Sequence, residues 1–534
     1  MSNSDNKPKK KWKLWQKILL IIGIIVLVLG IAAGAAFLYF RRTIGGNAPT
    51  VTIGEAVDEA VVETTGGLVR GYISNGIYTY HGIPYASAPE RFVAAQPVQK
   101  WDGVRDVAEF GPISPQGSLL GMSGSADQTG TDNDCLNLNI WTKGTSDNGK
   151  RPVMVWYHGG GFSTGSGNDA MYDGEALALS EDVVVVTVNH RLNLFGYMDL
   201  SSYGDKYANG GNQGVTDMVA SLEWIRDNIE RFGGDPENVT IFGQSGGGAK
   251  VLALMTTPSA KGLFSKGIVQ SGATDTMGLT FASKEASLAL TENILSKLGI
   301  SESNIEDIQT VSEAELQEAA GTALNEVGAQ FEIPAPFGGY AMEWGPVVDG
   351  DYMPTNPVTE DGFADAGKDV TLLIGSNLNE WAMAGASPSD EDATDEVKAA
   401  FEAAYPNESV SEITRFDTLL RYPLLKITRH KAMQGGAGVY SYVYTYDDNP
   451  MGAYHTAEIQ YVFNHADGDA MSKTLSQAWA SFAREGVPSS DNLPEWESYT
   501  METGAEMILD KESYVSYNHD LELLRLLNPG YDLD

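Results

Sequence analysis

Cysteine is almost absent from this chain of 534 residues, which contains only Cys135. A single cysteine excludes an intramolecular disulfide. A free cysteine of this kind is most often a small, buried, apolar side chain. The chain also lacks metal-ligand spacing and a phosphate-binding glycine loop, so we expect neither a metal nor a cofactor. The sequence Asp467-Gly468-Asp469 is typical of a simple turn.

Basic residues are scarce beside acidic ones. The chain has 35 Lys and Arg against 71 Asp and Glu, a formal net charge of −36. The first 42 residues hold eight of the basic residues and one acid, so the remainder carries −43. This charge repels phosphate backbones and excludes nucleic acid as a partner. It indicates a well-solvated surface, with attraction of cationic substrates as the functional alternative.

One long hydrophobic run is present, at residues 18–40, and its 23 residues carry no charge. A helix of this length crosses the ~30 Å of hydrocarbon in a bilayer. Six lysines precede the run and only Arg41 and Arg42 follow it, which predicts a cytoplasmic N-terminus. We therefore expect a single-pass protein of the cell membrane whose main domain lies outside the cytoplasm. The alternative is a signal peptide cleaved near Ala32–Ala36, which would give a secreted protein.

A candidate nucleophile lies in Gly243-Gln244-Ser245-Gly246-Gly247, directly after the apolar, strand-like run 239–242. The pattern G-x-S-x-G after a strand is typical of a nucleophile elbow, in which a sharp turn presents a serine hydroxyl at a helix N-terminus. By itself the pattern is weak, because glycine-rich turns around serine are common. It predicts Ser245 as the nucleophile of an acyl-transfer enzyme only if its catalytic partners are present.

A second glycine loop supports this interpretation. The apolar run 152–157 ends in His158-Gly159-Gly160-Gly161-Phe162. Acyl transfer places negative charge on the former carbonyl oxygen, which needs fixed N–H donors. Glycines let backbone amides approach that oxygen closely. Since such donors come from this type of loop and from the residue after the nucleophile, we expect them from Gly160, Gly161 and Gly246. A plain turn between strands is the alternative.

The general base must be a histidine that follows the nucleophile. Four histidines do so: His430, His455, His465 and His519. The segment around His430 has the pattern of an exposed helix, and His519 lies in a polar terminal segment. His455 follows a turn and precedes an amphipathic stretch, a position from which a loop side chain can reach the serine. We favour His455, with His465 as the weaker competitor.

The acid of the site is sought beyond a buried strand. Residues 370–374 form such a run, and the loop that follows contains Glu380. Asp349 is the rival, but it stands in an Asp-Gly pair, which is usually a turn. We therefore favour Glu380.

The chain resembles the carboxylesterase/cholinesterase family, also called type B carboxylesterases, from about Thr65 to Tyr499. The resemblance rests on motifs in the family's order: Gly82-Ile83-Pro84-Tyr85-Ala86, Arg91-Phe92, Phe110-Gly111-Pro112, Asp134-Cys135-Leu136-Asn137-Leu138-Asn139, the His158 glycine loop, Asn189-His190-Arg191-Leu192, Gly211-Asn212-Gln213-Gly214, Phe232-Gly233-Gly234-Asp235-Pro236, the elbow, Gly262-Leu263-Phe264, Gln270-Ser271-Gly272, Glu380, and Gly452-Ala453-Tyr454-His455-Thr456-Ala457-Glu458.

The resemblance implies an α/β-hydrolase fold: a central, mostly parallel sheet flanked by helices, with large helical insertions. It implies Ser245 as nucleophile, Glu380 as acid and His455 as base, with Gly160, Gly161 and Gly246 as the oxyanion hole. The chain departs from the family at several positions. Gly246 replaces alanine, Gln244 replaces glutamate and Trp381 replaces glycine. Ser114 stands where the family has the partner of the cysteine that matches Cys135.

The expected organisation is a basic cytoplasmic tail at 1–17, a transmembrane signal-anchor helix at 18–40, a linker at 41–61 and one catalytic domain at 62–534. Candidate insertions in that domain are 274–345, which has helical spacing, and 382–446. The expected activity is that of a serine carboxylesterase acting on small-molecule esters. A lipase, a serine peptidase of the same fold and a cell-surface recognition or adhesion module are the alternatives.

Overall fold

The computed structural model describes residues 53–117, 129–274, 281–335, 338–360, 362–382, 387–389, 391–448, 450–466 and 468–533. The predicted transmembrane segment 18–40 lies outside these residues. Within the described part of the chain, no helix is both long enough and apolar enough to cross a membrane.

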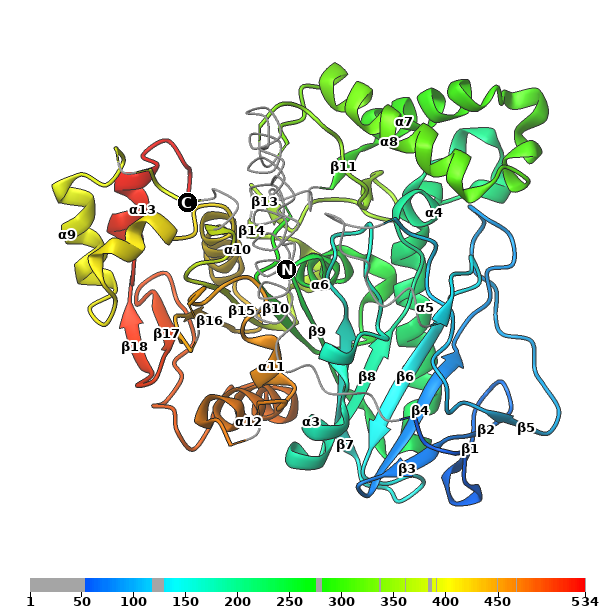
Figure 1. Cartoon of the computed structure of the whole chain (residues 1–534), viewed down its shortest axis with the longest axis horizontal. Helices are drawn as coiled ribbons and strands as arrows, with labels where there is room; N and C mark the ends of the chain where they lie inside the picture. Colours follow the sequence, from blue (N-terminus) through cyan, green and yellow to red (C-terminus); the bar gives the residue numbers. More distant parts are fainter. Residues whose placement is uncertain are drawn as a thin grey trace, which may run out of the picture. The chain divides into compact units, whose positions relative to one another are not determined.

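A central sheet organises the described residues (Figure 1). Its eleven strands run in the order β18-β17-β16-β15-β10-β9-β7-β8-β6-β4-β3. The seven strands from β17 to β8 are parallel, and antiparallel strands complete both ends. The strands are β3 (Tyr72–Ser74), β4 (Ile77–Pro84), β6 (Asn137–Thr142), β7 (Arg151–Tyr157), β8 (Val184–Val188), β9 (Gly234–Gln244), β10 (Lys266–Gln270), β15 (Thr371–Asn377), β16 (Val439–Tyr444), β17 (Ala505–Leu509) and β18 (Tyr514–Tyr517).

The sequence explains why these strands form the core. Every residue of β8 and β10 is buried, which requires cover on both faces and fits the continuous apolar runs of parallel strands. The strands predicted at 152–157, 239–242 and 370–374 are confirmed as β7, β9 and β15. Their register aligns the carboxyl ends of neighbouring strands, because Tyr157 pairs with Gly243 and Gln244 with Gln270. Loops that leave these ends therefore meet at one edge, where open α/β sheets place ligands.

Helices cover the sheet in two groups. Helices α3 and α12 pack together, α12 also against β7 and β9, while α6 packs against β9 and β10, and α10 against β15 and β16. The helices outside the insertion described below are α3 (Glu175–Glu181), α4 (Asn193–Tyr197), α5 (Gln213–Asn228), α6 (Gly246–Thr256), α9 (Asp395–Ala404), α10 (Arg421–Gln434), α11 (Ile459–Val462), α12 (Ala470–Glu485) and α13 (Leu521–Leu527).

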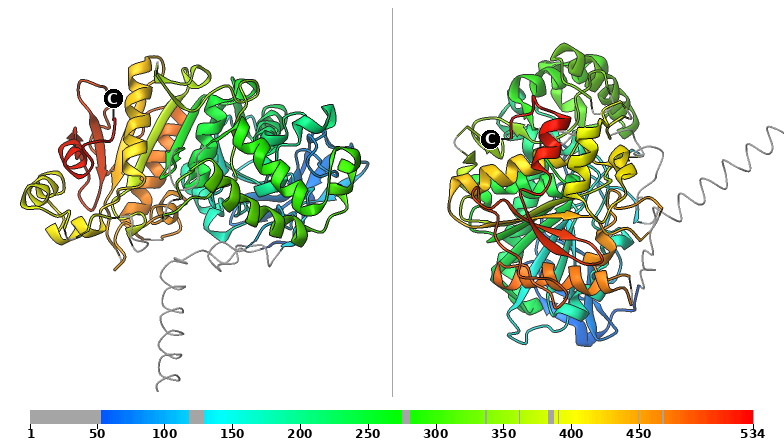
Figure 2. Two further views of the ribbon diagram at one scale, coloured as in Figure 1. Left: turned by 90° about the horizontal axis from the view of Figure 1, so that it is seen from above. Right: turned by 90° about the vertical axis from the view of Figure 1, so that its left-hand side faces the viewer.

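The predicted helical insertion after residue 274 contains α7 (Lys284–Leu298) and α8 (Glu313–Gln330), which pack against each other (Figures 1 and 2). Ser283 caps α7, and Ser312 forms a capping box with Glu315 at the start of α8, so both helices begin at sequence-encoded caps. The second predicted insertion, 382–446, reaches too far, because its last residues form β16 inside the central sheet.

The folded body begins before the predicted boundary at residue 62. The Val57 amide donates to Gly71 O at 2.9 Å, and Ala60 is fully buried. A three-stranded sheet follows, made of β1 (Val61–Glu63), β2 (Leu68–Arg70) and β5 (Val104–Asp106). The remaining strands are β11 (Ala282–Ser283), β12 (Val347–Val348), β13 (Val358–Thr359) and β14 (Gly362–Phe363).

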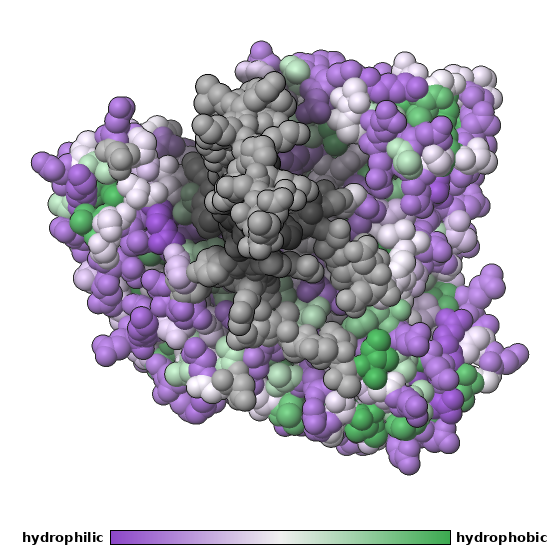
Figure 3. Space-filling model, viewed as in Figure 1, coloured by the Kyte–Doolittle hydropathy of each residue, from purple (hydrophilic) through white to green (hydrophobic). Residues whose placement is uncertain are grey.

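Short 3-10 helices connect many of these elements. They are η1 (Asp58–Ala60), η2 (Ala170–Tyr172), η3 (Ser201–Tyr203), η4 (Asp205–Tyr207), η5 (Gly210–Asn212), η6 (Ile229–Phe232), η7 (Pro258–Ala260), η8 (Glu302–Gln309), η9 (Asp365–Gly367) and η11 (Val410–Arg415). On the face drawn in Figure 3, hydrophilic residues predominate and hydrophobic ones form small patches. This surface fits the well-solvated character that the charge predicts.

Candidate active site

The elbow predicted around Ser245 is present between β9 and α6. Ser245 adopts φ 58° and ψ −125°, a backbone conformation that costs a non-glycine residue energy and is typical of functional sites. Its amide donates to Gln270 O at 2.8 Å, which ties the turn to the end of β10. The Ser245 side chain is half-buried at the N-terminus of the helix. The chain therefore presents this serine as a nucleophile elbow does.

Glycines make this turn possible. A Cβ on Gly247 would lie 2.0 Å from Tyr157 O, and a Cβ on Gly243 would lie 2.5 Å from the Gly247 backbone. Any larger residue at either position would collide with the backbone of β7 or α6. The G-x-S-x-G pattern is thus explained by the close approach of helix and strand.

The glycine loop after β7 lies beside the elbow. Gly160 and Gly161 have φ values of +90° and +62°, which glycine adopts easily. A Cβ on Gly246 would lie 2.5 Å from Gly161 N, so these backbone segments are in contact. None of the amides of Gly160, Gly161 and Gly246 donates a hydrogen bond to another described residue. Three predicted donors are therefore free to bind an oxyanion.

Hydrogen bonds fix the peptide planes of this loop. Gly159 O accepts from the Nδ1 of His158 at 2.8 Å, so that Nδ1 carries the proton. Gly160 O accepts from the amides of Thr164 and Ser163, at 3.0 and 3.3 Å. In a planar trans peptide the N–H points away from the C=O. Anchoring the carbonyls of residues 159 and 160 thus sets the directions of the Gly160 and Gly161 amides.

Glu380 and His455 are brought together at the same edge of the sheet. His455 Nδ1 lies 2.5 Å from Glu380 Oε2, and the second carboxylate oxygen, Oε1, accepts from the backbone amide of Asn377 at 2.7 Å. The backbone amide of His455 donates to Glu380 O at 3.0 Å. The side chain of Glu380 is fully buried and that of His455 is 9% exposed. No described residue forms a hydrogen bond with the Ser245 hydroxyl, a bond that often tightens only when substrate binds.

Comparison with known proteins identifies the family. The carboxylesterase family model matches residues 58–415 and 402–523. The chain belongs to the carboxylesterase family. It is 33% identical over 501 residues to the para-nitrobenzyl esterase of Bacillus subtilis, covering 88% of this chain and 99% of that protein. It is 30% identical over 502 residues to the phenmedipham hydrolase of Pseudarthrobacter oxydans, covering 85% and 96%.

A solved structure supports the same assignment. An esterase from Clostridium hathewayi, described as able to hydrolyse aliphatic aromatic polyesters, superposes with a TM-score of 0.78 at 35% identity, covering 89% of this chain and 99% of that one. The protein is therefore a serine carboxylesterase with an α/β-hydrolase fold, as its sequence predicted.

Two departures from the usual carboxylesterase sequence meet at the imidazole of His455. The amide nitrogen of Gln244 lies 3.3 and 3.2 Å from the two ring nitrogens. Because it is almost equally close to both, it lies over the ring face and not in the ring plane. The indole of Trp381 packs against the same ring, with centroids 4.5 Å apart and planes 34° apart. A neutral amide and an aromatic ring thus contact the imidazole where the family has a glutamate and a glycine.

Buried polar residues lie close to Glu380, and the sequence analysis assigned them no role. Glu458 accepts from Gln270 at 3.0 Å and from Asn377 at 2.8 Å. Burial, together with the charge of Glu380, raises the pKa of Glu458 and raises that of Asp417 to about 7. The signal for Glu458 and Gln270 was their place in the family motifs, whereas Asp417 had none.

The competing site residues lie elsewhere. Asp349 accepts from the amides of Asp351 and Met353, as its Asp-Gly pair predicted for a turn. His465 contacts Asp173 O at 2.9 Å, and burial lowers its pKa to about 4. His519 is buried against Tyr405. The prediction of an exposed helix around His430 is wrong, because most of α10 is buried and His430 is only 6% exposed.

The lone cysteine is buried, as predicted, and burial raises the pKa of its thiol. Ser114, at the position of the missing disulfide partner, is also buried and accepts from the Leu192 amide at 3.0 Å. The hydroxyl at this position therefore accepts a hydrogen bond from a residue 78 positions away in the sequence.

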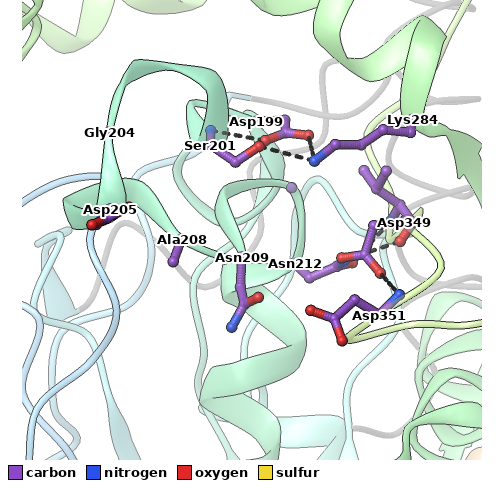
Figure 4. A pocket seen from close by; sticks show the side chains of 12 residues that line it. Asp199, Ser201, Gly204, Asp205, Ala208, Asn209, Asn212, Lys284, Asp349 and Asp351 are labelled. Carbon is purple, nitrogen blue, oxygen red and sulfur yellow. Dashed lines mark hydrogen bonds and ion pairs between the residues drawn. The ribbon is translucent and has the colours of Figure 1, made fainter.

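A polar pocket of about 290 Å³ lies where α7 joins the core, and neither the favoured residues Ser245, Glu380 and His455 nor the three glycines of the predicted oxyanion hole line it (Figure 4). In it, Lys284 Nζ lies 2.6 Å from Asp199 Oδ2 and donates to Ser201 Oγ at 2.9 Å. Asp349 accepts from Asn212 at 3.1 Å on the same wall. These bonds join the helical insertion to the catalytic core, which gives the pocket a structural explanation.

Proposed function

We propose that Ser245, His455 and Glu380 form the catalytic triad of this carboxylesterase. The observation that carries the proposal is the 2.5 Å contact of Glu380 with His455 Nδ1, at the edge of the sheet where the strained Ser245 turn and three free amides are also found. A carboxylate on Nδ1 orients the imidazole and leaves Nε2 to serve as the base.

The reaction follows from this arrangement. His455 takes the hydroxyl proton as Ser245 attacks the ester carbonyl, and the amides of Gly160, Gly161 and Gly246 bind the oxyanion. The protonated imidazole returns the proton to the leaving alcohol. A water molecule activated by the same histidine then cleaves the acyl-enzyme and frees the acid. Loss of one oxyanion donor should lower kcat by about 10²–10³-fold.

The test is hydrolysis of p-nitrophenyl acetate and p-nitrophenyl butyrate by residues 43–534 and by the Ser245→Ala variant. We expect kcat to fall by at least about 10⁴-fold in the variant with its circular dichroism unchanged. Ser180→Ala, an exposed serine on α3, is the matched control and should keep full activity. Substantial turnover by folded Ser245→Ala would reject the triad. An anilide analogue of the same acyl group distinguishes an esterase from a peptidase.

We also propose that residues 18–40 anchor the enzyme in the cell membrane, with the catalytic domain outside the cytoplasm. The uncharged run and the six lysines before it support this proposal. Full-length protein should stay with membranes after alkaline carbonate washing. N-terminal sequencing tests the alternative, because a new N-terminus near residue 36 would show signal-peptide cleavage and a secreted enzyme.

A further inference from the structure

Lys250 lies in α6, one turn beyond the elbow, and its side chain is fully buried. Its Nζ donates to His158 O at 2.8 Å and lies 6.0 Å from the centre of the Phe162 ring. Among the described residues, no carboxylate forms an ion pair with Lys250. The hydrogen bond to His158 O is thus the polar interaction that this buried amine makes with the glycine loop.

Burial of an amine without a counter-ion is unfavourable. It lowers the pKa of Lys250 well below its ordinary value of 10.5. A neutral amine still has N–H groups, so the bond to His158 O does not require a charge. Lys250 can therefore donate to the loop whether it is charged or neutral. It needs no carboxylate partner, whose negative charge would repel an oxyanion.

Three successive peptide planes of the loop are then held, each through its carbonyl. Lys250 holds His158 O, His158 holds Gly159 O, and the Ser163 and Thr164 amides hold Gly160 O. Because glycine restricts rotation so little, a free plane at the start of the loop would let the following planes turn. Lys250 comes from the helix that begins with Gly246, so it also links the two parts of the oxyanion hole.

We propose that Lys250 is a positioning residue of the oxyanion hole, fixing the first peptide plane of the glycine loop and thereby the aim of the Gly160 and Gly161 amides. The proposal rests on the proposed function of those amides. Lys250 touches no reacting atom in this scheme. Its effect is confined to states in which negative charge develops on the substrate oxygen.

Lys250→Met removes the donor and keeps the length of the side chain. Displacement of the donors should lower kcat by about 10- to 100-fold, while KM changes by less than about twofold. An aliphatic trifluoromethyl ketone, whose adduct with the serine carries an oxyanion, should lose affinity by the same factor as kcat/KM. A role in folding alone would not couple inhibitor affinity to kcat in this way.

Lys431→Met is the matched control. Lys431 is also buried, and its Nζ donates to Gly367 O at 3.0 Å and to Lys368 O at 2.8 Å. It lies in α10, outside the proposed catalytic site. We expect Lys431→Met to leave kcat and the ketone affinity unchanged, and Lys250→Met to keep its thermal midpoint within about 3 °C of the parent. Lys250→Leu, which also removes the N–H donor, replaces Lys250→Met in the same comparison if the latter does not fold.

The outcomes separate this inference from the proposed function. If Ser245→Ala is inactive and Lys250→Met keeps kcat within about twofold, the positioning role is wrong and the triad stands. A fall in kcat with unchanged ketone affinity also overturns the positioning role. Turnover by folded Ser245→Ala would overturn the proposed function and this inference with it.

Discussion

Gly246→Ala is expected to damage this enzyme although alanine is the usual family residue at this position. The added Cβ would lie 2.4 Å from Gly161 O and 2.5 Å from its Cα and N, where an ordinary contact needs at least 3.4 Å. The glycine loop would have to retreat by about 1 Å, and it carries two of the three proposed donors. A displacement of about 1 Å at a reacting centre can cost 10²-fold.

We therefore expect kcat for p-nitrophenyl butyrate to fall by about 10²-fold with little change in KM. The unfolding free energy should fall by no more than about 2.5 kcal/mol, because the helix gains about 0.5–1 kcal/mol from alanine and overpacking costs about 1–3 kcal/mol. Gly321→Ala is the control, since Gly321 is an exposed glycine of α8 with open space around its Cβ position. Gly246→Ala with kcat within about threefold of the parent would refute the reasoning.

Two further substitutions test stability. Lys284→Met leaves the fully buried Asp199 carboxylate without its cation and should cost about 2 kcal/mol in urea unfolding, whereas Lys473→Met, which breaks an exposed pair, should have no measurable effect. An equal loss of unfolding free energy in both variants would contradict the structural role given to the Lys284–Asp199 ion pair in the pocket. Asp417→Asn tests a pH dependence. Burial raises the pKa of Asp417 from 3.8 to about 7, so its proton favours the folded state at low pH and this contribution is lost as pH rises through about 7. The unfolding free energy of Asp417→Asn should therefore fall less than that of the parent between pH 5 and 7.5, and parallel curves would reject the assignment.

The turn around Ser245 and the glycine loop were predictable because their determinants are local. The elbow and the glycine loop each need glycines at fixed offsets, since a Cβ would strike the neighbouring backbone. Glu380 was preferred because it follows a buried strand, and the structure places it beside His455. The contacts of Gln244 and Trp381 with the imidazole of His455 could not be foreseen, because they join residues that are far apart in the sequence.

Helix α10 shows where sequence reasoning failed. Its charged residues suggested exposure, yet Arg421 is buried and forms ion pairs with Glu506 at 2.7 Å and Asp520 at 2.8 Å. These partners lie 85 and 99 residues further along the chain. A burial that depends on such distant carboxylates has no local signature, so helical periodicity alone assigns the wrong environment.

The wide spacing of the proposed triad along the chain has a consequence for biosynthesis. Glu380 and His455 are 75 residues apart, and the strand beside β16 is β17, which begins at Ala505. Parallel pairings over such separations form slowly, because the chain loses the entropy of closing a long loop before the strand contacts stabilise the sheet. Nearly the whole chain must therefore leave the ribosome before the sheet that carries the site can form. The proposed site can therefore form only late in biosynthesis, and a prematurely terminated chain would contain the proposed nucleophile without the sheet that positions it.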